Sequence, residues 1–134
     1  MSDIRVGIIG VGIMGAGHAR YITDSVDGAV VTAFFDLDAA RMDALAKELS
    51  AKSGATINMH SSVDALVNDP TVDAVIICSP DGLHPEHLEL CVKAKKPTLC
   101  EKPLAPRLED AKKIAEIVKS SGVPVALGFM RRFD

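Results

Sequence analysis

The stretch that determines the fold reads Ile4-Arg5-Val6-Gly7-Ile8-Ile9-Gly10-Val11-Gly12-Ile13-Met14-Gly15. An apolar run leads into a Gly-x-Gly-x-x-Gly turn, and a helix-patterned segment follows. A second apolar run ends at Asp36, about 20 residues further on. The motif alone is weak evidence, but a strand before it, a helix after it and an acid at this distance make a dinucleotide-binding fingerprint. The stretch therefore predicts nucleotide binding, with a merely structural strand-to-helix turn as the alternative.

Each glycine of the turn has a separate physical reason. Gly10 would permit a tight turn, Gly12 a close approach of the backbone to a phosphate, and Gly15 a close contact between helix and strand. Ile13 and Met14 begin the helix, whose N-terminal amides and dipole favour a pyrophosphate. We therefore predict that all five residues bind the cofactor.

The acid at the end of the second run indicates which dinucleotide binds. The carboxylate of Asp36 can accept hydrogen bonds from ribose hydroxyls and would repel a 2′-phosphate, so NAD is favoured over NADP. The first arginine after it is Arg41, on the following helix, so the loop lacks an obvious phosphate clamp. A helix cap is the alternative role for Asp36, although Asp38 is better placed to cap.

Composition excludes several classes of function. The 134 residues suffice for one domain, and a net charge of -3 offers no basic face for nucleic acid. No apolar stretch approaches the roughly 20 residues that span a bilayer, and the N-terminus lacks the pattern of a signal peptide. The three cysteines show no metal or redox spacing and are expected to be reduced core thiols. We expect a cytoplasmic protein with no metal site.

Short apolar runs alternate with longer helical patterns along the whole chain, which indicates a parallel sheet covered on both faces. Predicted strands cover residues 5–9, 30–35, 56–59, 72–78, 98–100 and 123–129. Predicted helices cover 13–22, a segment capped by Asp38, a short segment after a Ser61-Ser62-Val63-Asp64 capping box, a segment from His84-Pro85, and 107–121 before Gly122. Right-handed crossovers then predict a doubly wound Rossmann fold of six parallel strands, order 3-2-1-4-5-6, in three α/β/α layers.

Reacting groups in such a sheet gather beyond the carboxyl ends of the strands. Two segments stand there: Ser79-Pro80-Asp81-Gly82-Leu83-His84 and Glu101-Lys102-Pro103. His84 is a candidate for the rim of the cofactor or substrate site, or else a helix N-cap. His18, in the first helix, is expected to pack against the sheet.

These segments together resemble the Gfo/Idh/MocA family of oxidoreductases. The resemblance lies in the phosphate loop, in Ser79-Pro80 followed by His84, in residues 96–103 with their Glu-Lys-Pro element, and in the ending Gly128-Phe129-Met130-Arg131-Arg132-Phe133-Asp134. It covers the whole chain, and the ending is most similar to the inositol dehydrogenase branch.

The resemblance implies a role for each element. Lys102 corresponds to the family's lysine, which reaches the reacting hydroxyl or carbonyl of a sugar or cyclic polyol beside the nicotinamide; a surface lysine is the alternative. Ser79, Pro80, His84 and Glu101 would lie along the cofactor, and a cis bond is expected before Pro103. Glu101 would orient Lys102, meet the nicotinamide end of NAD, or merely pair with a nearby lysine in solvent.

Family members carry a second domain after the nucleotide domain, and this chain stops at Asp134. The first hypothesis is therefore that residues 1–134 are the NAD-binding half of a polyol or sugar dehydrogenase, homo-oligomeric when complete and catalytically incomplete alone. A truncated form, a fragment and a split gene product are all compatible with that ending. Two alternatives stay open: a stand-alone NAD-binding regulatory module, and an oligomerisation unit that uses residues 129–133. Arg131 and Arg132 would meet a ligand or a neighbouring domain, or form a solvated basic pair.

Overall fold

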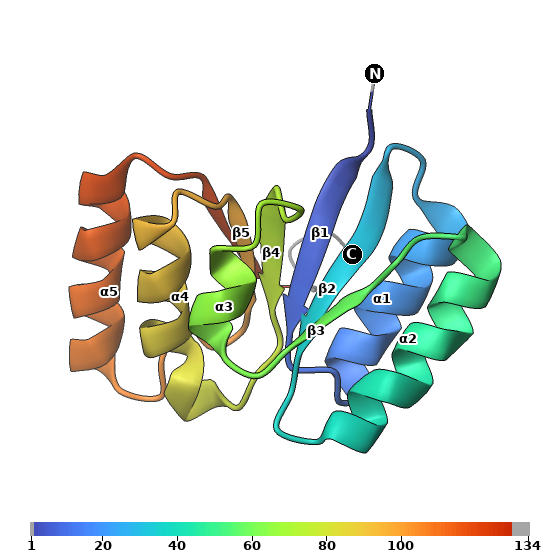
Figure 1. Cartoon of the computed structure of the whole chain (residues 1–134). Helices are drawn as coiled ribbons and strands as arrows, with labels where there is room; N and C mark the ends of the chain where they lie inside the picture. Colours follow the sequence, from blue (N-terminus) through green and yellow to red (C-terminus); the bar gives the residue numbers. More distant parts are fainter. Residues whose placement is uncertain (1, 130–134) are drawn as a thin grey trace.

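The sheet of the computed structural model, which describes residues 2–129, has six strands in the order β3-β2-β1-β4-β5-β6. All five neighbouring pairs are parallel (Figure 1). The strands are β1 (Ile4–Ile9), β2 (Ala29–Phe35), β3 (Asn58–His60), β4 (Ala74–Ile77), β5 (Thr98–Glu101) and β6 (Val125–Gly128). The doubly wound Rossmann order predicted from the sequence is confirmed.

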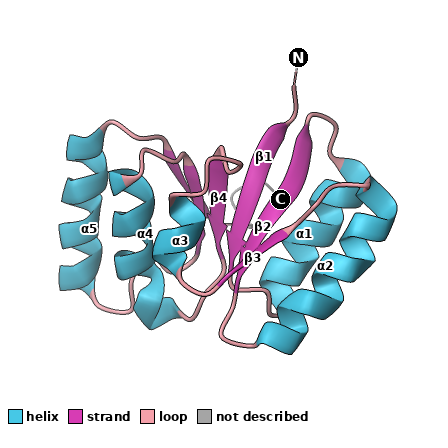
Figure 2. Ribbon diagram, viewed as in Figure 1, coloured by secondary structure: helices cyan, strands magenta, loops and turns pink. Residues whose placement is uncertain are grey.

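Helices cover both faces of this sheet (Figure 2). They are α1 (Ile13–Ser25), α2 (Ala39–Ser53), α3 (Val63–Val67), α4 (His84–Lys93) and α5 (Leu108–Ser121), with a short 3-10 turn η1 (Asp81–Leu83) before α4. Helices α1 and α2 lie on one face, and α3, α4 and α5 lie on the other (Figure 1). The three predicted layers are therefore present. Within residues 2–129, no helix is long and apolar enough to cross a membrane.

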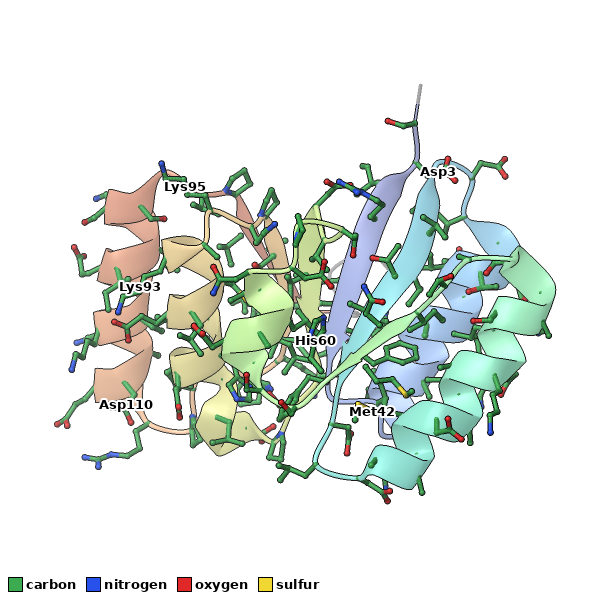
Figure 3. The ribbon with its side chains drawn as sticks, in the orientation of Figure 1. Asp3, Met42, His60, Lys93, Lys95 and Asp110 are labelled. Carbon is green, nitrogen blue, oxygen red and sulfur yellow. The ribbon has the colours of Figure 1, made fainter. Side chains whose placement is uncertain are left out.

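Each face of the sheet has its own hydrophobic core. Ile8 and Phe34 are fully buried against α1 and α2 on one face, where Met42 of α2 turns toward the strands (Figure 3). Ile77 and Leu88 are fully buried in the core on the other face. Burying side chains of this size stabilises the fold by about 1.5–3 kcal/mol each. The strands are apolar on both faces because both faces are covered.

Local hydrogen bonds define where the helices begin and end. The Asp38 side chain accepts from the backbone N–H of Arg41 and caps α2, as predicted. Gly122 ends α5 in the left-handed conformation, with φ of 70°. The predicted capping box is wrong, because the N-cap of α3 is Ser62, which accepts from the amide of Ala65. Asp64 is then one residue too early in the helix to reach back to the cap.

Helix α1 runs to Ser25, three residues beyond its predicted end, and the other differences concern strand ends. Strand β3 starts two residues later than predicted and reaches His60, because the residues that pair with Ala33 to Phe35 of β2 are Asn58 to His60. Strand β4 is shorter than predicted, since Val72 closes a turn by donating to the Asp69 carbonyl before the strand begins. At the carboxyl ends of β1 and β4, Ile9 pairs with Ile77, and the segments that follow the two strands then turn to opposite faces of the sheet. A crevice opens at this point of divergence.

Candidate functional site

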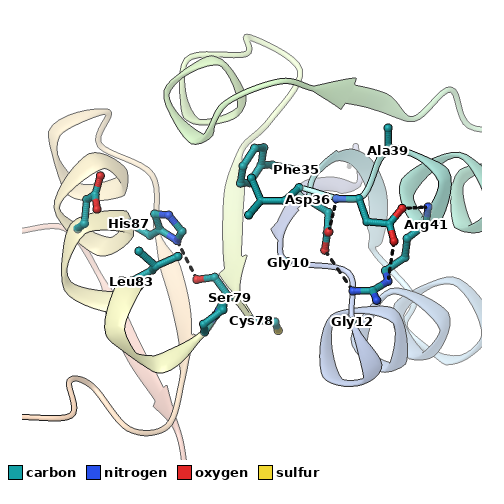
Figure 4. A pocket seen from close by; sticks show the side chains of 14 residues that line it. Gly10, Gly12, Phe35, Asp36, Ala39, Arg41, Cys78, Ser79, Leu83 and His87 are labelled. Carbon is teal, nitrogen blue, oxygen red and sulfur yellow. Dashed lines mark hydrogen bonds and ion pairs between the residues drawn. The ribbon is translucent and has the colours of Figure 1, made fainter.

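A cavity of about 850 Å³ lies beyond the carboxyl ends of β1, β2 and β4 (Figure 4). Its lining comes from the phosphate loop, the end of β2, the first turn of α2 and the segment after β4. The lining residues used below are Gly10, Gly12, Asp36, Arg41, Ser79 and His87. The cavity therefore stands at the switch point of the strand order, where open α/β sheets bind their ligands.

The three glycines of the loop are needed for three different reasons. Gly10 has φ of +89°, and a Cβ there would lie 2.7 Å from the backbone of Cys78. A Cβ on Gly15 would lie 1.8 Å from the carbonyl oxygen of Gly10. A Cβ on Gly12 would meet only the end of the Arg41 side chain, at 3.7 Å. Gly10 and Gly15 are thus required by the protein itself, whereas Gly12 leaves space in the cavity.

Asp36 faces the loop from the end of β2. Its side chain is only 12% exposed, and its two oxygens accept from the amides of Val11 and Asp38, both at 2.8 Å. A carboxylate offers about four acceptor positions, so two remain for a ligand. Arg41 reaches to 3.9 Å from Asp36 Oδ2 and lines the same cavity (Figure 4). The site therefore contains a guanidinium that the sequence had not suggested as a phosphate clamp.

The opposite wall is formed by the segment after β4 and by α4. Ser79 Oγ and His87 Nδ1 form a hydrogen bond of 2.7 Å (Figure 4). Burial lowers the pKa of His87, which keeps its imidazole neutral at physiological pH. This wall thus presents a neutral Ser79–His87 pair, and Glu86 of α4 adds a carboxylate to its lining.

A second cavity, of about 380 Å³, adjoins the first at Ser79, which lines both. Met14, His84, Glu101 and Lys102 all line it, so the structure brings the predicted Glu-Lys pair together with the loop helix. The Lys102 side chain is exposed, and the peptide bond between Lys102 and Pro103 is cis, as the resemblance implied.

Glu101 pairs with His18 of α1. His18 Nε2–H donates to Glu101 Oε1 at 2.7 Å, and Glu101 forms no ion pair with Lys102. His18 does contact the sheet, as expected, through Glu101 at the end of β5, but its side chain is also 27% exposed and lines the second cavity. A Cβ on Gly128 would lie 3.1 Å from the Glu101 carboxylate, so this glycine leaves the carboxylate its position.

His84 is not the N-cap of α4, which is Leu83. Its ring is 1% exposed and lies inside the protein between two loops. Its Nε2 is 2.7 Å from the carbonyl oxygen of Ser79, and its Nδ1 is 2.7 Å from that of Pro103. The backbone of His84 is already helical, with φ of −56° and ψ of −47°, which is why it does not serve as the cap.

Of the other residues predicted to belong to the site, some line a cavity and some do not. Pro80 lines the first cavity, whereas Ile13, 93% exposed, and the buried Gly15 line neither cavity. Arg131 and Arg132 lie outside the described residues. Among residues 2–129, no group of three or more His, Cys, Asp or Glu side chains is arranged to hold a metal ion.

All three cysteines are free thiols. Burial raises the pKa of Cys78 and Cys100 to about 12 and that of Cys91 to about 11. Protonated thiols are poor nucleophiles and poor metal ligands. Cys78 therefore lines both cavities as a small apolar group.

Comparison with known proteins now places the chain. A family model described as an oxidoreductase family with an NAD-binding Rossmann fold, Gfo/Idh/MocA, matches residues 4–129. The chain belongs to this family. Inositol 2-dehydrogenase 2 of Saccharopolyspora erythraea, a Gfo/Idh/MocA relative, is 44% identical over 98% of the chain and 38% of its own length. Inositol 2-dehydrogenase 2 of Paenarthrobacter aurescens is 41% identical over 98% of the chain and 39% of its own length.

Solved structures agree with this placement in the Gfo/Idh/MocA family. The scyllo-inositol dehydrogenase of Lactobacillus casei with bound NAD(H) and scyllo-inositol matches with a TM-score of 0.90 and 30% identity, over 99% of this chain and 38% of that one. The myo-inositol dehydrogenase of the same species, in complex with NAD(H) and myo-inositol, matches with a TM-score of 0.90 and 32% identity, over 98% and 38%. The chain thus spans less than two fifths of the length of these relatives.

Three residues of this Gfo/Idh/MocA site were missed from the sequence. His18 follows Met14 by one helical turn, so the two share a face of α1, and this spacing could have indicated it. His87 lies three residues after His84 on α4, again at helical spacing. Arg41 lies in the first turn of α2, three residues after the cap at Asp38, and its side chain turns back toward Asp36.

Proposed function

We propose that the larger cavity holds NAD, with the pyrophosphate at the N-terminus of α1 and the adenosine ribose on Asp36. The observation that carries the proposal is the placement of Gly12 and Asp36 on one cavity. Gly12 leaves room beside unpaired amides of the helix start, and Asp36 keeps two acceptor positions for ribose hydroxyls. The membership of the chain in an NAD-binding family supports the choice of cofactor.

The nicotinamide end would lie toward the second cavity, since Ser79 lines both cavities and joins them. NAD supplies a hydride acceptor there. Lys102 is the charged donor on this wall, and its ammonium can hydrogen-bond a substrate hydroxyl and take part in moving the proton that leaves it. Glu101 is held away from Lys102 by His18, which leaves the ammonium free for substrate.

The whole protein is proposed to be a dehydrogenase that transfers hydride from a secondary alcohol of a cyclic polyol or sugar to NAD. The names of the relatives, inositol 2-dehydrogenases, support this class of substrate. Because the chain spans only 38% of such a relative, we propose that residues 1–134 bind NAD but turn over little alone. A cytoplasmic homo-oligomer belongs to the same proposal, and the three free thiols support a reducing compartment.

The first experiment is calorimetric titration of the 134-residue chain with NAD, alongside the Lys102→Ala variant. We expect saturable binding to both proteins with similar affinity, because Lys102 is assigned to the substrate. Absence of binding to the unaltered chain would overturn the cofactor proposal. A rate with NAD and myo-inositol equal to that of a full-length family enzyme would overturn the proposed incompleteness.

A second experiment separates catalysis from the binding-only alternative. The chain is joined to the remaining portion of a Gfo/Idh/MocA relative, and hydride transfer is followed by NADH absorbance. Lys102→Ala should reduce kcat at least about a hundredfold, the range expected for a lost acid–base group. An unchanged kcat would remove Lys102 from the reaction.

A further inference from the structure

We propose that His84 is a positioning residue that ties the Lys102 segment to the wall of the NAD cavity by donating hydrogen bonds from both ring nitrogens. The inference rests on the proposed function of the two cavities. It starts from the two contacts of 2.7 Å that the ring makes, with the carbonyl oxygens of Ser79 and Pro103.

The chemistry of the two partners determines what the ring must do. A backbone carbonyl oxygen only accepts hydrogen bonds, and a neutral imidazole has only one N–H to donate. Both contacts are hydrogen bonds only when both nitrogens carry a proton. Since the ring is 1% exposed, water cannot satisfy the nitrogen that would otherwise face a carbonyl unprotonated. His84 is therefore assigned as an imidazolium with two charge-assisted bonds.

The two carbonyls belong to the loops that follow two neighbouring strands, β4 and β5. Ser79 follows β4 and lines both cavities, and Pro103 directly follows Lys102. His84 lies between them at the start of α4, within the rigid core of the fold. Beyond the last pair of the two strands, a single buried side chain thus bridges the cofactor wall and the Lys102 backbone.

The surrounding charges are compatible with a cation at this place. The other titratable side chains that line the second cavity are His18, Cys78, Asp81, Glu101 and Lys102. Two of these are carboxylates, from η1 and from the end of β5, and they offset the charges of the imidazolium and of Lys102. On α4 itself, the burial that lowers the pKa of His87 keeps that ring neutral.

The direct test is nitrogen NMR of the 134-residue chain labelled with [15N]histidine, without NAD. The His84 signals are assigned by their loss in His84→Gln, and His60→Gln serves as the matched control because His60 lines neither cavity. We expect both ring nitrogens of His84 to be protonated at pH 7 and to exchange slowly with solvent. A ring with one unprotonated nitrogen would overturn the proposal.

Two conservative variants test the positioning itself. The amide nitrogen of Gln matches Nε2, which donates to Ser79, and that of Asn matches Nδ1, which donates to Pro103. Backbone hydrogen exchange should therefore quicken about tenfold near Lys102 and Leu104 in His84→Gln but near Ser79 in His84→Asn. Equal loosening of both segments in both variants would contradict the assigned bonds.

If either variant fails to fold, the NMR state of the unaltered chain still decides the question. NAD binding is measured separately, so its absence would count against the proposed function and leave the His84 result standing.

Discussion

Replacing Asp36 by serine should shift the cofactor preference of the chain toward NADP. Asp36 places a carboxylate, 12% exposed, where the adenosine ribose is proposed to lie. A 2′-phosphate on that ribose would bring a second negative charge beside it. Serine removes the negative charge, opens space and leaves Arg41, now 3.9 Å from the carboxylate, free to contact a phosphate.

The magnitude follows from this geometry. Two unit charges about 4 Å apart interact by about 4 kcal/mol at an effective dielectric constant of 20. Screening at the open rim of the cavity reduces this repulsion, so we take about half of it. A change of about 2 kcal/mol corresponds to roughly a thirtyfold change in the ratio of the NADP and NAD affinities. Loss of the ribose hydrogen bonds should weaken NAD itself in the same variant.

The assay is calorimetric titration of NAD and NADP into the unaltered chain, Asp36→Ser, and Asp36→Ser combined with Arg41→Gln. The double variant should lose most of the gain for NADP, because the guanidinium is the group that replaces repulsion with attraction. Thermal unfolding of each variant is measured alongside its titration, because Asp36 also accepts a hydrogen bond from the amide of Val11 and its loss could destabilise the fold. A folded Asp36→Ser protein with an unchanged NADP-to-NAD ratio would refute the placement of the ribose.

Three further predictions use other parts of the molecule. Gly12→Ala should weaken NAD binding at least about tenfold with little change in Tm, whereas Gly15→Ala should lower Tm, because its Cβ would lie 1.8 Å from a carbonyl oxygen. Calorimetric titration measures the loss of binding, and thermal unfolding measures the loss of stability. Iodoacetamide at pH 8 should not modify the cysteines of the native protein, as mass spectrometry would show, since burial raises their pKa to about 11 or 12. The contribution of the protonated thiols to the free energy of unfolding is full below about pH 8.5 and is lost as the pH rises toward those values. Burial opposes ionisation of Asp69, but hydrogen bonds from Thr71 and His60 prevail and lower its pKa, so its contribution to stability is full above about pH 4 and lost on acidification. Asp69→Asn should flatten that loss in urea unfolding between about pH 5 and pH 2.

The phosphate loop could be predicted from the sequence because its requirements are local. Gly10 must adopt positive φ and Gly15 must lie against the loop carbonyl, and no other residue type meets either condition. The caps at Asp38 and Gly122 were predictable for the same reason, since each bonds or bends within one helical turn. Features that depend only on local geometry can therefore be recognised in the local sequence.

The partners of His18 and His84 could not be predicted in this way. His18 bonds Glu101, 83 positions away, and His84 bonds Pro103, 19 positions away. Beside a proline at a helix start, a histidine resembles a cap, and nothing nearby in the chain indicates that its ring turns inward. Only the parallel sheet, which brings the ends of β4 and β5 together, places the two loops within reach of one ring.

The same reasoning explains why the second cavity depends on an inconspicuous glycine. Gly128 is the last residue of β6 and pairs with Glu101 in the sheet, so any side chain there would project toward the carboxylate at 3.1 Å. The carboxylate would have to move, and its bond with His18 would be strained or lost. Because Glu101 precedes Lys102, such a displacement would also release the carboxylate toward the ammonium. A residue without a side chain, on the edge strand, thereby leaves the His18–Glu101 bond intact beside Lys102, the residue that we propose contacts the substrate.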